Sequence, residues 1–134
     1  MIVDTSALVA ILLDEPDAEK LSAAIAANTP RIISAVSALE ASIVIESKKG
    51  EAGLALLDEL LNLAQFEIVA FDDAQQQLAR VAYRRYGKGR HPAGLNFGDC
   101  CAYALAKVRN EALLFKGNDF NLTDITAARL FPAH

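Results

Sequence analysis

Four acidic residues stand where the chain passes from one expected element to the next. Asp4 ends a short apolar run, and Asp119 closely follows a later one. Glu40 lies near the start of an expected helix, and Asp99 opens another. Packed carboxylates repel one another and raise one another's pKa unless a cation joins them. Such oxygen ligands suit Mg²⁺ or Mn²⁺, so the residue types indicate metal-assisted hydrolysis of a phosphodiester.

Short apolar runs alternate with longer helical segments, which predicts an α/β fold. The expected strands are Met1–Asp4, Arg31–Ser34, Phe66–Phe71, Leu113–Phe115 and a short edge strand at Ala127–Phe131. The expected helices are Ser6–Leu13, Pro16–Asn28, Ala35–Lys49, Glu51–Ala64, Asp73–Tyr86 and Asp99–Asn110. This order predicts a three-layer α/β/α sandwich around a short, mostly parallel central sheet of four to five strands. Ligands bind beyond the carboxyl ends of such strands, so the four acids should meet at one edge of the sheet.

Several of these polar residues also suit a purely local role. Asp4 and Asp99 have the residue type that caps helices. Ser34 or Ser37 can cap the helix expected from Ala35, and Ser37 also has capping-box spacing with Glu40. Asn96 is expected to fix the loop before Asp99 through side-chain to backbone hydrogen bonds. Capping and metal binding are compatible, so these alternatives stay open.

Charge is segregated along the chain. The formal net charge is −4, and an acidic protein binds nucleic acid poorly unless it carries a local basic patch. Residues 74–98 contain no Asp or Glu but several cations. The candidate RNA contacts are Arg80, Arg84, Arg85, Lys88 and Arg90, together with Lys116. The alternative is that these residues form only a solvated face.

Composition bounds the class of protein. With 134 residues, 53% of them hydrophobic, we expect one globular domain over 1–134. Cys100 and Cys101 are adjacent and show no zinc-site spacing, so we expect packing residues in a reduced, cytoplasmic protein. The N-terminal apolar run is short and interrupted by Asp4, so neither a signal peptide nor a membrane anchor is expected.

The motifs around the acids resemble those of PIN-domain ribonucleases, specifically the VapC-type toxins of bacterial type II toxin–antitoxin systems. The segment MIVDTSALVAILLDEPDAE is similar to the first motif of that family, and SALEASIVIE to the second. The segment GKGRHPAGLNFGDCCAYALAK resembles the third motif, and LLFKGNDFNLTDI the fourth. The resemblance runs over nearly the whole chain and implies a PIN-like form of the expected sandwich.

The resemblance also implies roles for individual residues. It assigns Asp4 and Asp99 as metal ligands for Mg²⁺ (or Mn²⁺) and Glu40 as the acid that completes the site. Asp119 matches the last acid, while Asn118 stands where some relatives place another acid. Thr5 and Ser6 match hydroxyl positions that hydrogen-bond a carboxylate or a metal-bound water.

The same resemblance implies a Mg-dependent endoribonuclease toxin acting on a structured tRNA or rRNA. It further implies a homodimer that is inhibited by a cognate VapB-type antitoxin. Two other classes stay open from the residues alone. One is a catalytically weak PIN-fold RNA-binding or regulatory module, and the other is a metal-dependent phosphatase or DNA nuclease.

Overall fold

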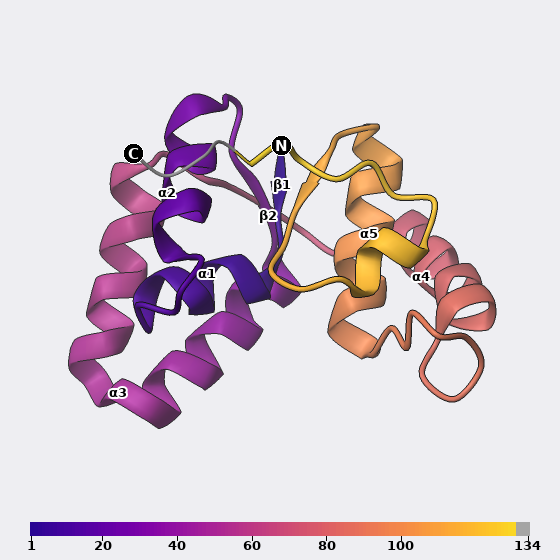
Figure 1. Ribbon diagram of the computed structural model, residues 1–134, viewed down its shortest axis with the longest axis horizontal. Coiled ribbons are helices and arrows are strands. Elements are labelled where there is room, and N and C mark those ends of the chain that lie inside the picture. Colours follow the sequence, from indigo (N-terminus) through magenta and orange to yellow (C-terminus); the bar gives the residue numbers. More distant parts are fainter. Residues whose placement is uncertain (131–134) are drawn as a thin grey trace.

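A short parallel sheet stands between two groups of helices in the computed structural model, which describes residues 1–130 (Figure 1). The strands are β1 (Ile2–Val3), β2 (Ile32–Ser34), β3 (Glu67–Val69) and β4 (Leu113–Leu114). The helices are α1 (Thr5–Leu12), α2 (Ala18–Ala27), α3 (Ala35–Leu63), α4 (Asp73–Tyr86) and α5 (Phe97–Arg109), with a 3₁₀ turn η1 at Asp119–Leu122. The predicted α/β/α sandwich is confirmed.

The four strands are all parallel and lie in the order β3-β2-β1-β4. Ile2 of β1 pairs with Ile32 on one side and with Leu113 on the other. Parallel neighbours point their carboxyl ends the same way, so the segments after β1, β2 and β4 reach one edge of the sheet. This edge is where the acidic residues were expected.

The strands β1, β2 and β4 are completely buried because both of their faces are covered, whereas the edge strand β3 is largely exposed. Ile2, Ile32 and Leu113 belong to the core under α4 and α5, and the next residues, Val3, Ile33 and Leu114, belong to the core under α1, α2 and α3. Successive side chains of a strand point to opposite faces, so a continuous apolar run fills two cores. The sequence pattern of short unbroken apolar runs thus follows from the three-layer architecture.

The long helix α3 bends sharply at Gly50, whose φ of 66° and ψ of −160° are not helical. Figure 1 shows the two arms of α3 meeting at an angle below α1. The sequence predicted two helices separated at Gly50, and the structure agrees with that break. Glycine tolerates positive φ without steric cost, which explains the residue type at this corner.

The predicted boundaries that differ from the structure include those of the last helix and the last strand. Helix α5 begins at Phe97, with Asn96 as its N-cap, so Asp99 lies in the first turn and does not open the helix. The expected edge strand at 127–131 is reduced to one parallel bridge between Ala127 and Leu113, and Phe131 lies outside the described residues. Within residues 1–130, no helix is long and apolar enough to cross a membrane.

Candidate active site

Asp4 directly follows β1 and is almost completely buried, with 4% of its surface exposed. Its Oδ2 accepts hydrogen bonds from the backbone N–H of Ser6 (3.0 Å) and from Ser6 Oγ (2.6 Å), so Asp4 is also the N-cap of α1. Ser6 Oγ in turn accepts the backbone N–H of Lys116 at 3.0 Å. Ser6 therefore joins the Asp4 carboxylate to the segment that follows β4.

Glu40 lies in the second turn of α3 and is held by a residue beside Asp4. Thr5 Oγ1 lies 2.9 Å from Glu40 Oε1 and 3.0 Å from the carbonyl oxygen of Ser37, so these two acceptors share its single hydroxyl proton. Of the two predicted caps, Ser34 is the one that caps α3, by accepting a hydrogen bond from the N–H of Val36, so the capping box of Ser37 and Glu40 is not formed. Glu40 is therefore available to the site.

Asp99 is half-buried in the first turn of α5 and forms a capping box with Asn96. Asn96 Oδ1 accepts the N–H of Asp99 at 2.9 Å, and Asp99 Oδ2 accepts the N–H of Asn96 at 3.0 Å. The expectation that Asn96 fixes this loop through side-chain to backbone bonds is confirmed. The capping box holds Asp99 in place while leaving its Oδ1 outside this pair of bonds.

Gly98 was not predicted as a site residue, yet it lies directly against Glu40. A Cβ atom placed on Gly98 would be 2.3 Å from both carboxylate oxygens of Glu40. Only glycine allows the α5 backbone to approach this carboxylate so closely. The Phe-Gly pair immediately before Asp99 was the available sequence signal, but its partner 58 positions earlier was not visible from spacing.

Asp119 is exposed at the start of η1, next to Asn118, the N-cap of that turn. Its negative charge raises the pKa of Asp99, which places the two side chains within electrostatic reach. Asn118 makes no side-chain capping bond to η1. The structure thus brings Asp119 toward the other acids but leaves it less constrained than they are.

Electrostatics couple the acids to one another. The pKa of Asp4 is raised to about 6, mainly by burial and also by the charges of Asp99 and Glu40, although the hydrogen bonds from Ser6 act to lower it. Burial also raises the pKa of Asp99, helped by the charges of Asp119 and Glu40. No salt bridge within residues 1–130 involves any of these acids. The cluster carries negative charge without a cationic side chain to balance it.

The donor set fits a hard divalent cation, because carboxylate oxygens are the ligands that Mg²⁺ and Mn²⁺ prefer. In the arrangement seen across residues 1–130, no group of three or more His, Cys, Asp or Glu side chains converges closely enough to hold a metal ion as it stands. The fit therefore rests on the chemistry of the donors and on their uncompensated, partly buried charge.

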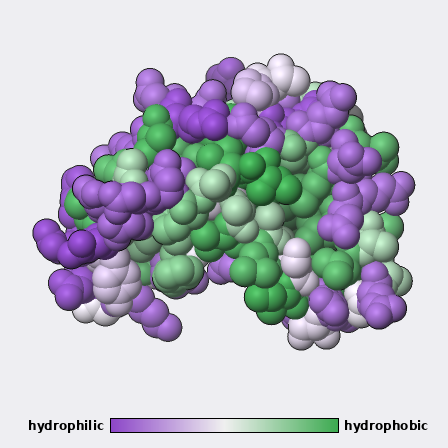
Figure 2. Space-filling view, turned by 180° about the vertical axis from the view of Figure 1, so that it is seen from behind, coloured by the Kyte–Doolittle hydropathy of each residue, from purple (hydrophilic) through white to green (hydrophobic). Residues whose placement is uncertain are grey.

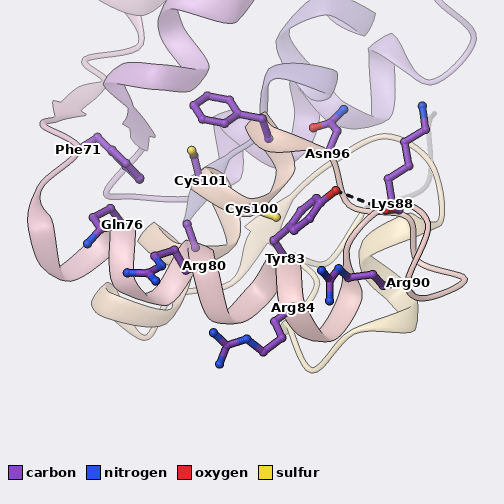
Figure 3. Close-up of a pocket in the computed structure, with 12 residues that line it drawn as sticks. Phe71, Gln76, Arg80, Tyr83, Arg84, Lys88, Arg90, Asn96, Cys100 and Cys101 are labelled. Carbon is purple, nitrogen blue, oxygen red and sulfur yellow. Dashed lines mark hydrogen bonds between the residues drawn. The ribbon is translucent and has the colours of Figure 1, made fainter.

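The predicted basic residues separate into two groups. Arg80, Arg84, Lys88 and Arg90 line a pocket of about 690 Å³ between α4 and the start of α5 (Figure 3). Arg85 instead stacks over the ring of Tyr86, 4.9 Å from its centroid. Lys116 forms an ion pair with Glu15. Four of the six predicted cations thus face one common space.

Cys100 and Cys101 are buried and unbonded, as expected for packing residues. Burial raises the pKa of both thiols to about 11, so neither is a thiolate near neutral pH. Negative charge contributes as well, from Asp99 at Cys100 and from Glu40 at Cys101. The two cysteines therefore lie under the acids without taking part in nucleophilic chemistry.

A parallel sheet with acids gathered beyond its strand ends defines a class of metal-site nuclease fold. Residues 1–125 match the PIN domain family, and the chain belongs to that family.

Similar proteins narrow the class further. The chain is 59% identical over 127 residues to a ribonuclease VapC of Mycolicibacterium smegmatis, covering 95% of this chain and 98% of that protein. It superposes on Mycobacterium tuberculosis VapC20, a sarcin-ricin loop cleaving toxin, with a TM-score of 0.80 at 12% identity, covering 97% and 98% of the chains. It superposes on a chain of VapBC2 from Rickettsia felis, bound to a promoter DNA fragment, with a TM-score of 0.73 at 18% identity, covering 97% and 98%. Within the PIN family this chain is one of the VapC ribonucleases, the RNA-hydrolysing toxins of toxin–antitoxin systems.

Proposed function

We propose that Asp4, Glu40, Asp99 and Asp119 form a Mg²⁺-dependent (or Mn²⁺-dependent) site that cleaves RNA phosphodiester bonds endonucleolytically. The observation that carries the proposal is the mutual electrostatic coupling of buried Asp4 with Asp99 and Glu40, without a cationic partner. A bound divalent cation supplies charge neutralisation for the scissile phosphate and lowers the pKa of an attacking water.

The chain's own residues have distinct roles in this proposal. Asp4 and Asp99 would hold the cation, each being fixed by a capping hydrogen bond of its own helix. Glu40 would accept the proton of the attacking water at Oε2, since Oε1 already accepts the hydrogen bond from Thr5. Asp119 would add a further oxygen from the loop after β4. Positioned carboxylates act as general bases when their geometry is fixed, and the contacts of Thr5 and Gly98 fix Glu40.

The direct test is cleavage of RNA with Mg²⁺, with EDTA, and with the variant Asp4→Asn. We expect products only with Mg²⁺ and only from the protein with Asp4 intact. The matched control is Asp14→Asn, which makes the same charge change at an exposed residue whose positive φ of 51° suits Asn. Undiminished cleavage by Asp4→Asn would remove Asp4 from the mechanism.

The same assay separates the alternative of a PIN-fold binding or regulatory module. Tight RNA binding without products at any divalent cation concentration would favour that module. Comparing turnover on RNA, single-stranded DNA and a phosphate monoester separates the ribonuclease from a DNA nuclease or a phosphatase on the same acids.

We further propose a cognate VapB-type antitoxin, a homodimer, a structured tRNA or rRNA as substrate, and a cytoplasmic location. The first rests on membership of the VapC ribonucleases and on the VapBC2 complex of Rickettsia felis. A structured RNA substrate agrees with the sarcin-ricin loop that VapC20 cleaves. The buried free thiols agree with a reducing compartment. Co-purification with the product of an adjacent gene tests the antitoxin, and light scattering tests the dimer.

A further inference from the structure

The pocket of about 690 Å³ between α4 and the first turn of α5 is strongly cationic (Figure 3). Arg80, Arg84, Lys88 and Arg90 line it, and no acidic side chain does. Its volume lies within the range of about 300–1,000 Å³ that is usual for small-molecule sites. The pocket therefore favours a ligand that carries negative charge and of which a part of moderate size enters the pocket.

Two exposed aromatic rings belong to the same pocket. Two contacts hold Tyr83 in place. The Arg90 guanidinium lies over the Tyr83 ring, 5.8 Å from the ring centroid, and the Tyr83 hydroxyl donates to the carbonyl oxygen of Lys88 at 3.4 Å. Phe97 is 74% exposed at the first position of α5. Figure 2 shows apolar surface gathered between the polar outer parts of the molecule, around a hollow at its lower edge. Exposed rings within a cationic pocket suit a ligand with flat faces as well as negative charge.

The pocket is continuous with the acid cluster. Asn96 lines it and also caps Asp99, and Phe97 stands two positions before Asp99. Cys101 lines the pocket and lies close enough to Glu40 for that carboxylate to raise the thiol pKa. An occupant of the pocket is therefore the immediate neighbour of whatever the acids hold.

We propose that this pocket is a nucleobase subsite, in which an unpaired RNA base beside the cleaved phosphodiester stacks on Tyr83 and Phe97. The flanking phosphates contact the arginines and Lys88 around it. Bases of single-stranded RNA bind proteins by stacking on aromatic side chains and guanidinium groups. The inference rests on the proposed function, because the acids beside the pocket are taken to act on RNA.

Other occupants fit less well. A second copy of this chain placed pocket to pocket would bring four more cations to a face that already holds four. An acidic peptide would satisfy the charge, but it has no requirement for exposed rings next to a phosphodiester-cleaving site. RNA satisfies the charge, the rings and the position together.

The test measures binding by fluorescence anisotropy in EDTA, so that no RNA is cleaved. The probes are a fluorescein-labelled adenosine hexaribonucleotide and a hexamer of abasic ribose units with the same phosphates. The variants are Tyr83→Leu and Phe97→Leu, which keep apolar bulk but remove the ring. Val81→Ala is the control, because Val81 is 43% exposed on α4 and does not line the pocket.

Base stacking of typical strength predicts that each leucine variant weakens binding of the adenosine hexamer by about 5- to 160-fold. Binding of the abasic hexamer should be unchanged in the variants, and Val81→Ala should match the wild type on both probes. Equal losses on both probes, or no loss on either, would overturn the subsite. A change in molar mass by light scattering in either leucine variant would overturn it in favour of a protein–protein face. The proposed cleavage reaction is tested separately, by comparing RNA cleavage with Mg²⁺ between the wild type and Asp4→Asn, so failure of the one proposal can be told apart from failure of the other.

Discussion

Replacing Gly98 with alanine should move Glu40 without unfolding the protein. The added Cβ would lie 2.3 Å from both carboxylate oxygens, whereas ordinary carbon–oxygen contacts are about 3.3 Å or longer. One of the two groups must therefore shift by roughly 1 Å. The end of the Glu40 side chain yields more easily than the α5 backbone, so the carboxylate moves and its hydrogen bond from Thr5 is strained.

A misplacement of about 1 Å at a catalytic group costs on the order of 100-fold in rate. That loss corresponds to about 2.7 kcal/mol of transition-state stabilisation. The stability effect should be much smaller, since alanine is favoured over glycine in helices by up to about 1 kcal/mol and offsets part of the crowding. We therefore expect Gly98→Ala to lose about 100-fold in kcat/KM on RNA with Mg²⁺ while its Tm stays within a few degrees of wild type.

The same substitution should also be made in a protein that already carries Glu40→Asp. Aspartate is one methylene shorter than glutamate, so its carboxylate leaves room for a Cβ atom on residue 98. In that background Gly98→Ala should cost little further activity, so the two substitutions should be strongly non-additive. Full activity of Gly98→Ala, or an additive loss in the double variant, would refute the argument that Gly98 sets the position of Glu40.

Three further substitutions probe the hydrogen bonds and charges around the acids. The pKa of Asp4 is raised from 3.8 to about 6, mainly by burial, so the folded state binds the Asp4 proton more tightly than the unfolded state does. The contribution of this proton to the free energy of unfolding is fully present below pH 4 and is lost as the pH rises through 6. Asp4→Asn should accordingly raise the free energy of unfolding of the metal-free protein by about 3 kcal/mol at pH 7 and leave it unchanged near pH 4, as measured by urea denaturation. Ser6→Ala removes a hydrogen bond that lowers the pKa of Asp4, so the acid limb of the pH–rate profile should move up by about 1–2 pH units; an unmoved limb would contradict this role. Thr5→Val removes the hydrogen bond to Glu40 and should lower kcat by about 2- to 13-fold with little change in KM, which steady-state kinetics on RNA checks.

The tertiary structure corrected several local interpretations. Ser37 and Glu40 have capping-box spacing, but Ser34 caps α3 and Thr5 binds Glu40. Lys116 remains a candidate RNA contact, and the structure adds that it pairs with Glu15, 101 positions earlier in the chain. In each case the local pattern was compatible with more than one partner, and the packing of distant elements decided which partner is present.

The sequence alone predicted the element order and the parallel sheet, and it singled out the four acids of the candidate site. Unbroken apolar runs alternating with helical segments have few compact solutions, and acids after such runs fall at one edge of the sheet. Only the tertiary structure placed Gly98 against Glu40, joined Ser6 to the segment after β4, and gathered Tyr83, Phe97 and the arginines around one pocket. These contacts depend on how α3, α4 and α5 pack, and chain spacing carries no information about the distance between side chains on different helices.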